Sequence, residues 1–134
     1  MAIICMACIT NVSAQKTKTP VAAEKAFLQK FPQAKEVRWE KEGKTAYEAT
    51  FMQDGKKGSA NFSPAGEWLE TEMAISLAAD PKTVIDGFNM AFNGAVITEI
   101  FKIESKTGKN YFEIEYSVTG KKKEVKLSTD GKPL

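Results

Sequence analysis

The chain contains an internal repeat, and this repeat constrains its fold more than any other feature of the sequence. The stretch 47–69 recurs as the stretch 112–134, at an offset of 65 residues. Aromatic, aliphatic and glycine positions coincide at that offset, including the hairpin-turn pairs Asp54-Gly55 and Thr119-Gly120. Apolar and polar residues alternate between the turns of each copy, which is typical of antiparallel hairpins. Two related antiparallel sheets are therefore expected.

A short amphipathic helix is predicted before each sheet. The apolar stripes of the two helices are Ala23, Phe27 and Phe31 in the first copy and Val84, Phe88 and Phe92 in the second. Thr19-Pro20 and Asp80-Pro81 each predict an N-cap followed by proline at the first helical position. The helices are offset by 61 residues, so the loops of the second copy are expected to hold additional residues.

The predicted fold is α+β, a tandem repeat of one helix followed by four antiparallel strands. The two halves are expected to share one sheet, with both helices on the same face. The first repeat is assigned to residues 20–72 and the second to residues 80–134. Residues 15–19 are expected to form a tether, and residues 73–79 a linker between the halves.

Alternation assigns the strand residues to two faces. The face under the helices is expected to carry Tyr47, Ala49, Phe51, Ala60, Phe62, Phe112, Ile114, Tyr116, Val118, Val125 and Leu127. The opposite face, called the open face below, is expected to carry Glu48, Thr50, Met52, Ser59, Asn61, Tyr111, Glu113, Glu115, Glu124 and Lys126. Trp39 alternates with the core positions and is predicted to be core.

Two register interpretations compete for Trp68. If Leu69 is on the core side, alternation places Trp68 on the open face, where it would anchor an interface. A bulge after Gly66 would instead reverse the register and bury Trp68 over the core. The candidate partner-binding residues on the open face are Trp68, Met52, Tyr111, Glu48 and Glu113.

The N-terminal segment 1–14 is predicted to be a signal peptide. Its apolar run is too short to span a bilayer and ends in Val12-Ser13-Ala14, a small-residue cleavage site before Gln15. The alternative is a buried first strand. Both cysteines, Cys5 and Cys8, lie in this segment, so the mature chain would have no thiol chemistry. A periplasmic or secreted protein is expected.

The residue types that most active sites need are scarce. The chain has no histidine, which excludes Ser-His and Cys-His nucleophilic arrangements and nearly all zinc, copper and haem sites. We expect no cofactor and no metal. The net charge of +2 argues against nucleic acid or an anionic membrane as a partner. Carboxylate-based hydrolysis is left as an alternative, through Glu48, Glu113 and Glu115.

Three segments carry a resemblance to a known family. They are Val37-Arg38-Trp39, Tyr47-Glu48-Ala49-Thr50-Phe51 and Gly66-Glu67-Trp68-Leu69-Glu70-Thr71-Glu72. These segments resemble the PepSY-like, beta-lactamase-inhibitor-like family of small secreted Gram-negative bacterial proteins. The resemblance implies a tandem helix-plus-sheet fold, export to the periplasm and no established activity. The second half departs from the pattern, with Ile103 in place of Trp39 and Pro133 in place of Trp68.

These observations together predict a non-enzymatic binding or inhibitory module. It would use the open face of the sheet on a protein or peptide partner in the periplasm. The alternatives are an accessory envelope domain without a fixed partner and the carboxylate-based hydrolase.

Overall fold

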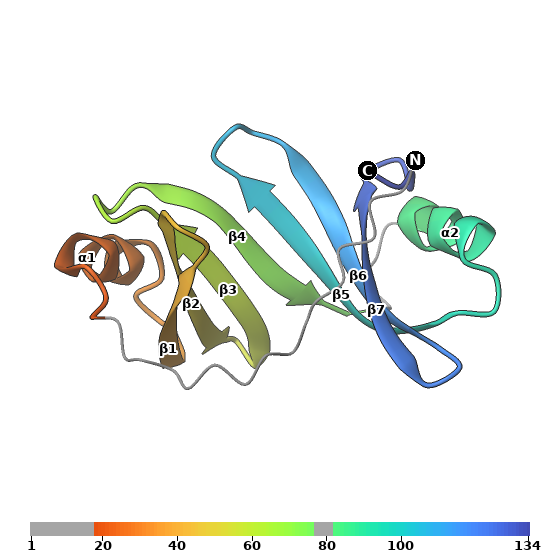
Figure 1. Cartoon of the computed structure of the whole chain (residues 1–134), viewed down its shortest axis with the longest axis horizontal. Helices are drawn as coiled ribbons and strands as arrows, with labels where there is room; N and C mark the ends of the chain where they lie inside the picture. Colours follow the sequence, from red (N-terminus) through yellow and green to blue (C-terminus); the bar gives the residue numbers. More distant parts are fainter. Residues whose placement is uncertain (1–17, 77–81) are drawn as a thin grey trace.

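The computed structural model describes residues 18–76 and 82–134, which form two helices and one sheet of seven strands (Figure 1). The helices are α1 (Val21–Lys30) and α2 (Lys82–Ala91). The strands are β1 (Lys35–Glu42), β2 (Ala46–Gln53), β3 (Lys56–Phe62), β4 (Trp68–Ile75), β5 (Val96–Ser105), β6 (Asn110–Val118) and β7 (Lys121–Ser128). All neighbouring strands are antiparallel and follow the chain order. The predicted α+β fold with one shared sheet is confirmed.

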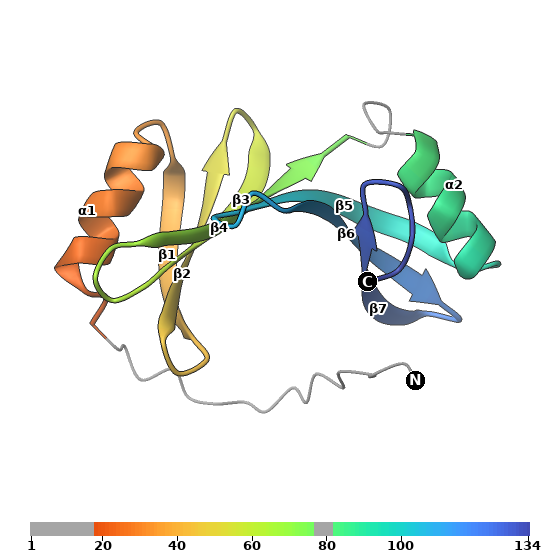
Figure 2. The same ribbon diagram turned by 90° about the horizontal axis from the view of Figure 1, so that it is seen from above.

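Each helix packs on the strands of its own half and forms a separate core. The first core contains Ala23, Phe27, Phe31, Ala49, Phe51, Ala60 and Phe62. The second contains Val84, Phe88, Ile100, Phe112, Ile114, Tyr116 and Leu127. Figures 1 and 2 show α1 and α2 at opposite ends of the molecule, with the sheet between them. The predicted helix stripes and core faces are therefore confirmed, because their central residues are buried in these two clusters.

The start of the first helix differs from the prediction. Pro20, and not Thr19, is the N-cap residue, and no side chain caps the helix. The backbone of Pro20 is extended, with ψ at 132°, so the helix begins one residue later, at Val21. The predicted signal peptide at 1–14 and the Asp80-Pro81 cap lie outside the described residues.

The second half has fewer strands than the prediction of four. It contributes β5, β6 and β7, and an isolated bridge between Leu127 and Pro133 takes the place of a fourth strand. Proline has no amide hydrogen to donate to a sheet ladder. In the first half β4 continues through Ile75, three residues into the expected linker 73–79. This extension pairs with β5 and joins the two halves.

The predicted turns are confirmed by the backbone. Asp54-Gly55 and Thr119-Gly120 all have positive φ angles, as a two-residue type I′ hairpin requires. Gly66 and Gly131 also have positive φ and each lies against its own helix. A Cβ at Gly66 would lie 2.6 Å from the carbonyl oxygen of Ala22. A Cβ at Gly131 would lie 2.4 Å from that of Thr83, so only glycine fits these turns.

Strand pairing locates the additional residues of the second copy. Trp39 lies opposite Ala49, whereas Ile100 lies opposite Ile114. The offsets within these pairs are 61 (100 − 39) and 65 (114 − 49), so four residues are inserted in the hairpin between β5 and β6. Ile100, and not Ile103 as the sequence comparison suggested, therefore takes the place of Trp39. Ile103 consequently lies on the other face of the sheet.

Candidate functional site: the open face of the sheet

One row of residues crosses the open face with one member from each strand. Direct cross-strand neighbours link Arg38, Thr50, Ser59, Glu72, Ile103, Tyr111 and Ser128. None of them belongs to the two clusters under the helices. Both helices cover the opposite face, so this row runs across a face that no helix packs against.

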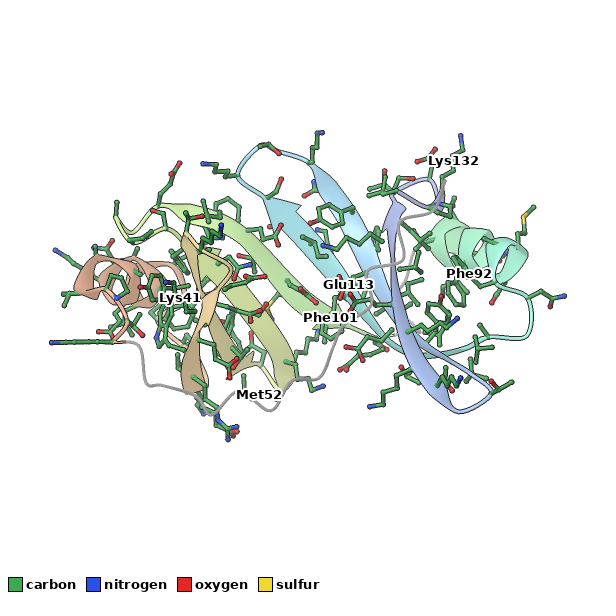
Figure 3. The ribbon with its side chains drawn as sticks, in the orientation of Figure 1. Lys41, Met52, Phe92, Phe101, Glu113 and Lys132 are labelled. Atoms are coloured by element: carbon green, nitrogen blue, oxygen red, sulfur yellow. The ribbon has the colours of Figure 1, made fainter. Side chains whose placement is uncertain are left out.

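Two large apolar side chains lie on the open face near the joint between the halves. Ile103 is 1% exposed and Phe101 is 8% exposed, although neither belongs to a helix-covered core. Phe101 lies opposite Ala74 on one side and Glu113 on the other, near the middle of the molecule in Figure 3. Sequence reasoning missed both residues as members of this face. The helix offset of 61, applied to β5 as well, would have found them.

The first half of the open face is hollowed. The hollow has a volume of about 430 Å³ and extends from β1 to β5. Its lining residues on the open face include Arg38, Glu48, Met52, Lys57, Glu72 and Phe101. An apolar wall and several charged groups are therefore combined in one concave site, which is the usual composition of a binding pocket.

Carboxylates dominate the charge of the open face. They are Glu42, Glu48, Glu70, Glu72 and Glu113, each of which contributes to or shares the raised pKa values described below. Lys126 is 3.8 Å from Glu113, which is a long ion pair. Within residues 18–76 and 82–134, the other four have no basic side chain within 4 Å.

Burial and mutual repulsion shift the protonation of these groups. Burial, followed by the negative charges of Glu113 and Glu48, raises the pKa of Glu72 to about 7. Burial is also the main reason that the pKa values of Glu42 and Glu113 are raised. The pKa of Tyr111 is raised by burial and by the hydrogen bond that its hydroxyl donates to Glu70 at 3.0 Å.

Four of the five predicted partner-binding residues lie on the open face. Glu48 and Met52 line the hollow, whereas Tyr111 and Glu113 lie on β6, in the second half. The buried amide oxygen of Asn61, between Glu48 and Glu70 in the register, has no hydrogen-bond donor among the residues described.

The placement of Trp68 on the open face is wrong. The register shifts between Asn61 and Phe62, so that Phe62 lies opposite Trp68, and the indole packs against the first core. Its Nε1 donates to the hydroxyl of Thr71 at 2.8 Å, and Lys30 Nζ lies 4.0 Å from the ring centre. A bulge reverses the face of every later residue, and this is the second of the two interpretations given above.

The carboxylates named for hydrolysis are not cross-strand neighbours. Glu48 lies on β2 and Glu113 on β6, with three strands between them. Glu115 pairs instead with Glu99 and Glu124. Among the residues that the structure describes, no group of three or more acidic side chains could hold a metal ion. The expected facing arrangement of Glu48, Glu113 and Glu115 is therefore not formed by strand pairing.

Residues 45–133 match the family described as "Putative beta-lactamase-inhibitor-like, PepSY-like". The chain belongs to this family. The match spans both halves of the PepSY-like protein, including the strands that build the open face. The family description is inhibitor-like and not catalytic. No curated protein matches the sequence. Neither helix of the described residues has the length and apolarity of a membrane span.

Solved structures from Bacteroides share the fold of this PepSY-like protein. A structure from Bacteroides eggerthii, titled as putative periplasmic proteins, has a TM-score of 0.77 at 20% identity and covers 87% of this chain and 86% of its own. A DUF2874 family protein from Bacteroides ovatus has a TM-score of 0.73 at 21% identity, covering 86% and 84%. A BLIP-like protein from Bacteroides fragilis has a TM-score of 0.66 at 26% identity, covering 84% and 81%.

Proposed function

We propose that this PepSY-like protein is a non-catalytic periplasmic module that binds a protein or peptide partner on its open face. The observation that carries the proposal is the position of Phe101 and Ile103, large apolar residues on a face that no helix covers. They lie beside a hollow of about 430 Å³. A concave apolar surface with a polar rim is typical of a recognition site.

The comparisons support the same class of function. The family is described as inhibitor-like, and inhibitors of enzymes act by binding a protein. The Bacteroides eggerthii title supports a periplasmic location, as does the signal peptide predicted for residues 1–14. The proposed contact residues are Phe101, Met52, Glu48, Tyr111 and Glu113, and they exclude Trp68.

Capture of a partner tests the proposal. The immobilised protein is exposed to periplasmic extract, the retained protein is identified by mass spectrometry, and its affinity is then measured with purified components. Replacing Phe101 or Met52 with alanine is expected to weaken binding by about tenfold or more, as loss of an interface anchor does. Leu28→Ala is the matched control, because Leu28 is 62% exposed on α1.

Thermal melts must show that each variant is folded. The proposal is contradicted if both open-face variants bind the partner as the unmodified protein does, or if Leu28→Ala alone abolishes binding.

A further inference from the structure

The hollow on the open face has two chemically different sides. Met52 of β2 and Phe101 of β5 give it apolar walls, and Glu48 and Glu72 bring carboxylates to the same cavity. A long side chain with an apolar stem and a polar end would match both sides. The hollow is therefore shaped for more than a flat apolar contact.

The cations that belong to the hollow do not neutralise these two carboxylates. Lys57 pairs with Glu99 instead, at 2.9 Å. Arg38 lines the hollow, but within the described part of the chain it has no carboxylate within 4 Å. Glu48 and Glu72 are thus acceptors without a charged donor.

A further acceptor lies at the same edge. Asn61 pairs directly with Glu48 in the register, and its buried amide oxygen has no donor among residues 18–76 and 82–134. Acceptors therefore exceed donors on this side of the hollow. A buried acceptor without a donor costs free energy, which a ligand rich in N–H groups would recover.

We infer that the hollow receives a lysine or arginine side chain of the protein partner, so that the partner presents a basic segment to this face. The inference rests on the proposed function and names the chemistry of the partner. The methylene stem of the incoming residue packs between Met52 and Phe101, and its charged end donates hydrogen bonds to Glu48 and Glu72. Hydrogen bonds between ionised groups are the stronger kind.

Other ligand classes fit the site less well. A phosphate-bearing partner such as nucleic acid would be repelled by the carboxylates of the open face. A metal ion would need several ligands converging on one point, and no such group exists among the described residues. A lysine or arginine side chain needs only a carboxylate pair at the end of an apolar slot.

Binding is also expected to depend on pH. The cation prefers ionised Glu72, whose pKa is raised to about 7 by burial and by its acidic neighbours. The charged groups that face Glu72 are Glu48 on β2, Glu70 on the same strand, Glu113 on β6 and Lys126 on β7. Affinity should therefore rise between pH 6 and pH 8, as Glu72 loses its proton.

Methyl NMR with a defined peptide tests the inference. The probe is acetyl-Gly-Gly-Lys-Gly-Gly-amide, added to the full chain carrying labelled methionine methyl groups. The Met52 methyl signal is expected to shift in a saturable manner, whereas that of Met90, which is 87% exposed on α2, is expected to stay constant. The same peptide with acetylated lysine should produce no shift.

Two variants complete the test. Glu48→Gln combined with Glu72→Gln should weaken binding of the lysine peptide by about tenfold or more, as loss of a charge-assisted contact does. Glu104→Gln, an exposed carboxylate elsewhere on β5, should leave it unchanged. Equal shifts with acetylated lysine, or no saturable shift of Met52 up to 20-fold higher peptide concentration than the protein shows for other contacts, would overturn the inference.

Failure of the inference can be told apart from failure of the proposed function. If the captured partner binds the Glu48→Gln, Glu72→Gln protein normally but is lost on Phe101→Ala, the open face is the interface and the cationic contact is wrong. If neither variant changes binding of the partner, the proposed function itself fails.

Discussion

Glu72 on β4 and Ile103 on β5 are direct cross-strand neighbours on the open face. They belong to the one strand pair that joins the two halves of the sheet. Ile103 is 1% exposed, so the carboxylate of Glu72 lies beside a buried aliphatic side chain. This location explains why burial is the largest cause of the raised pKa of Glu72.

The Glu72 carboxyl is expected to make stability depend on pH. Its pKa is about 7 in the folded protein against an ordinary value of 4.5, so the folded state binds more protons between these values. The resulting stabilisation is fully present below pH 4.5 and is lost as pH rises through 7. Glu72→Gln should therefore raise the free energy of unfolding by about 1–3 kcal/mol at pH 8 and change it little at pH 4.

Urea denaturation of both proteins at the two pH values measures this effect. Glu104→Gln is the control, because Glu104 is an exposed residue of the same strand pair. An equal gain at pH 4 and pH 8 would show that Glu72 does not titrate in this range.

Phe51 and Tyr116 are expected to behave alike as repeat equivalents. Phe51 lies 5.2 Å from the ring of Phe27, and Tyr116 lies 5.1 Å from that of Phe88. Both residues are less than 10% exposed. Phe51→Ala and Tyr116→Ala should each reduce the free energy of unfolding by roughly 3–5 kcal/mol, measured by chemical denaturation. A loss below about 1 kcal/mol at either site would contradict its burial.

Trp68 is expected to matter for stability and not for partner binding. Trp68→Ala removes packing against the first core, the hydrogen bond to Thr71 and the contact with Lys30. A loss of about 2–4 kcal/mol is expected in denaturation experiments. Trp68→Phe keeps most of the packing and should lose only about 1 kcal/mol. Unchanged melting with lost partner binding would instead make Trp68 an interface residue.

The turn glycines Gly66 and Gly131 are expected to tolerate no side chain. Each has a positive φ, and an added Cβ would press against a helix carbonyl oxygen. Gly66→Ala and Gly131→Ala should each destabilise the protein by at least about 1–3 kcal/mol in thermal or urea melts. Gly120→Ala separates the two causes, because Gly120 has a φ of 79° but no atom within 4 Å of the added Cβ. Equal losses at all three positions would mean that the helix contact contributes nothing.

Processing of the N-terminus is a prediction from the sequence alone. The apolar segment ending in Val12-Ser13-Ala14 predicts a mature chain that begins at Gln15. N-terminal sequencing of protein recovered from the periplasm checks this. A chain that still begins at Met1 would retain Cys5 and Cys8 and would contradict cleavage.

The sequence by itself determined the tandem fold and most of the core. Local rules were sufficient because a repeat at a fixed offset shows which residues have equivalent roles. Asp54-Gly55 and Thr119-Gly120 specify tight hairpins, and alternation then places Phe51 and Tyr116 on the same face as the helices. The open-face positions of Glu48, Met52, Tyr111 and Glu113 follow from the same alternation.

Only the tertiary structure decided the faces of Trp68 and Ile103. The register shift between Asn61 and Phe62 reverses one, and the four residues inserted between β5 and β6 reverse the other. The side-chain period of a strand is two, so an undetected bulge or a misplaced insertion of odd effect moves a residue to the opposite face. The raised pKa of Glu72 has the same origin, since it depends on Glu48 and Glu113, which pairing brings near from distant parts of the chain.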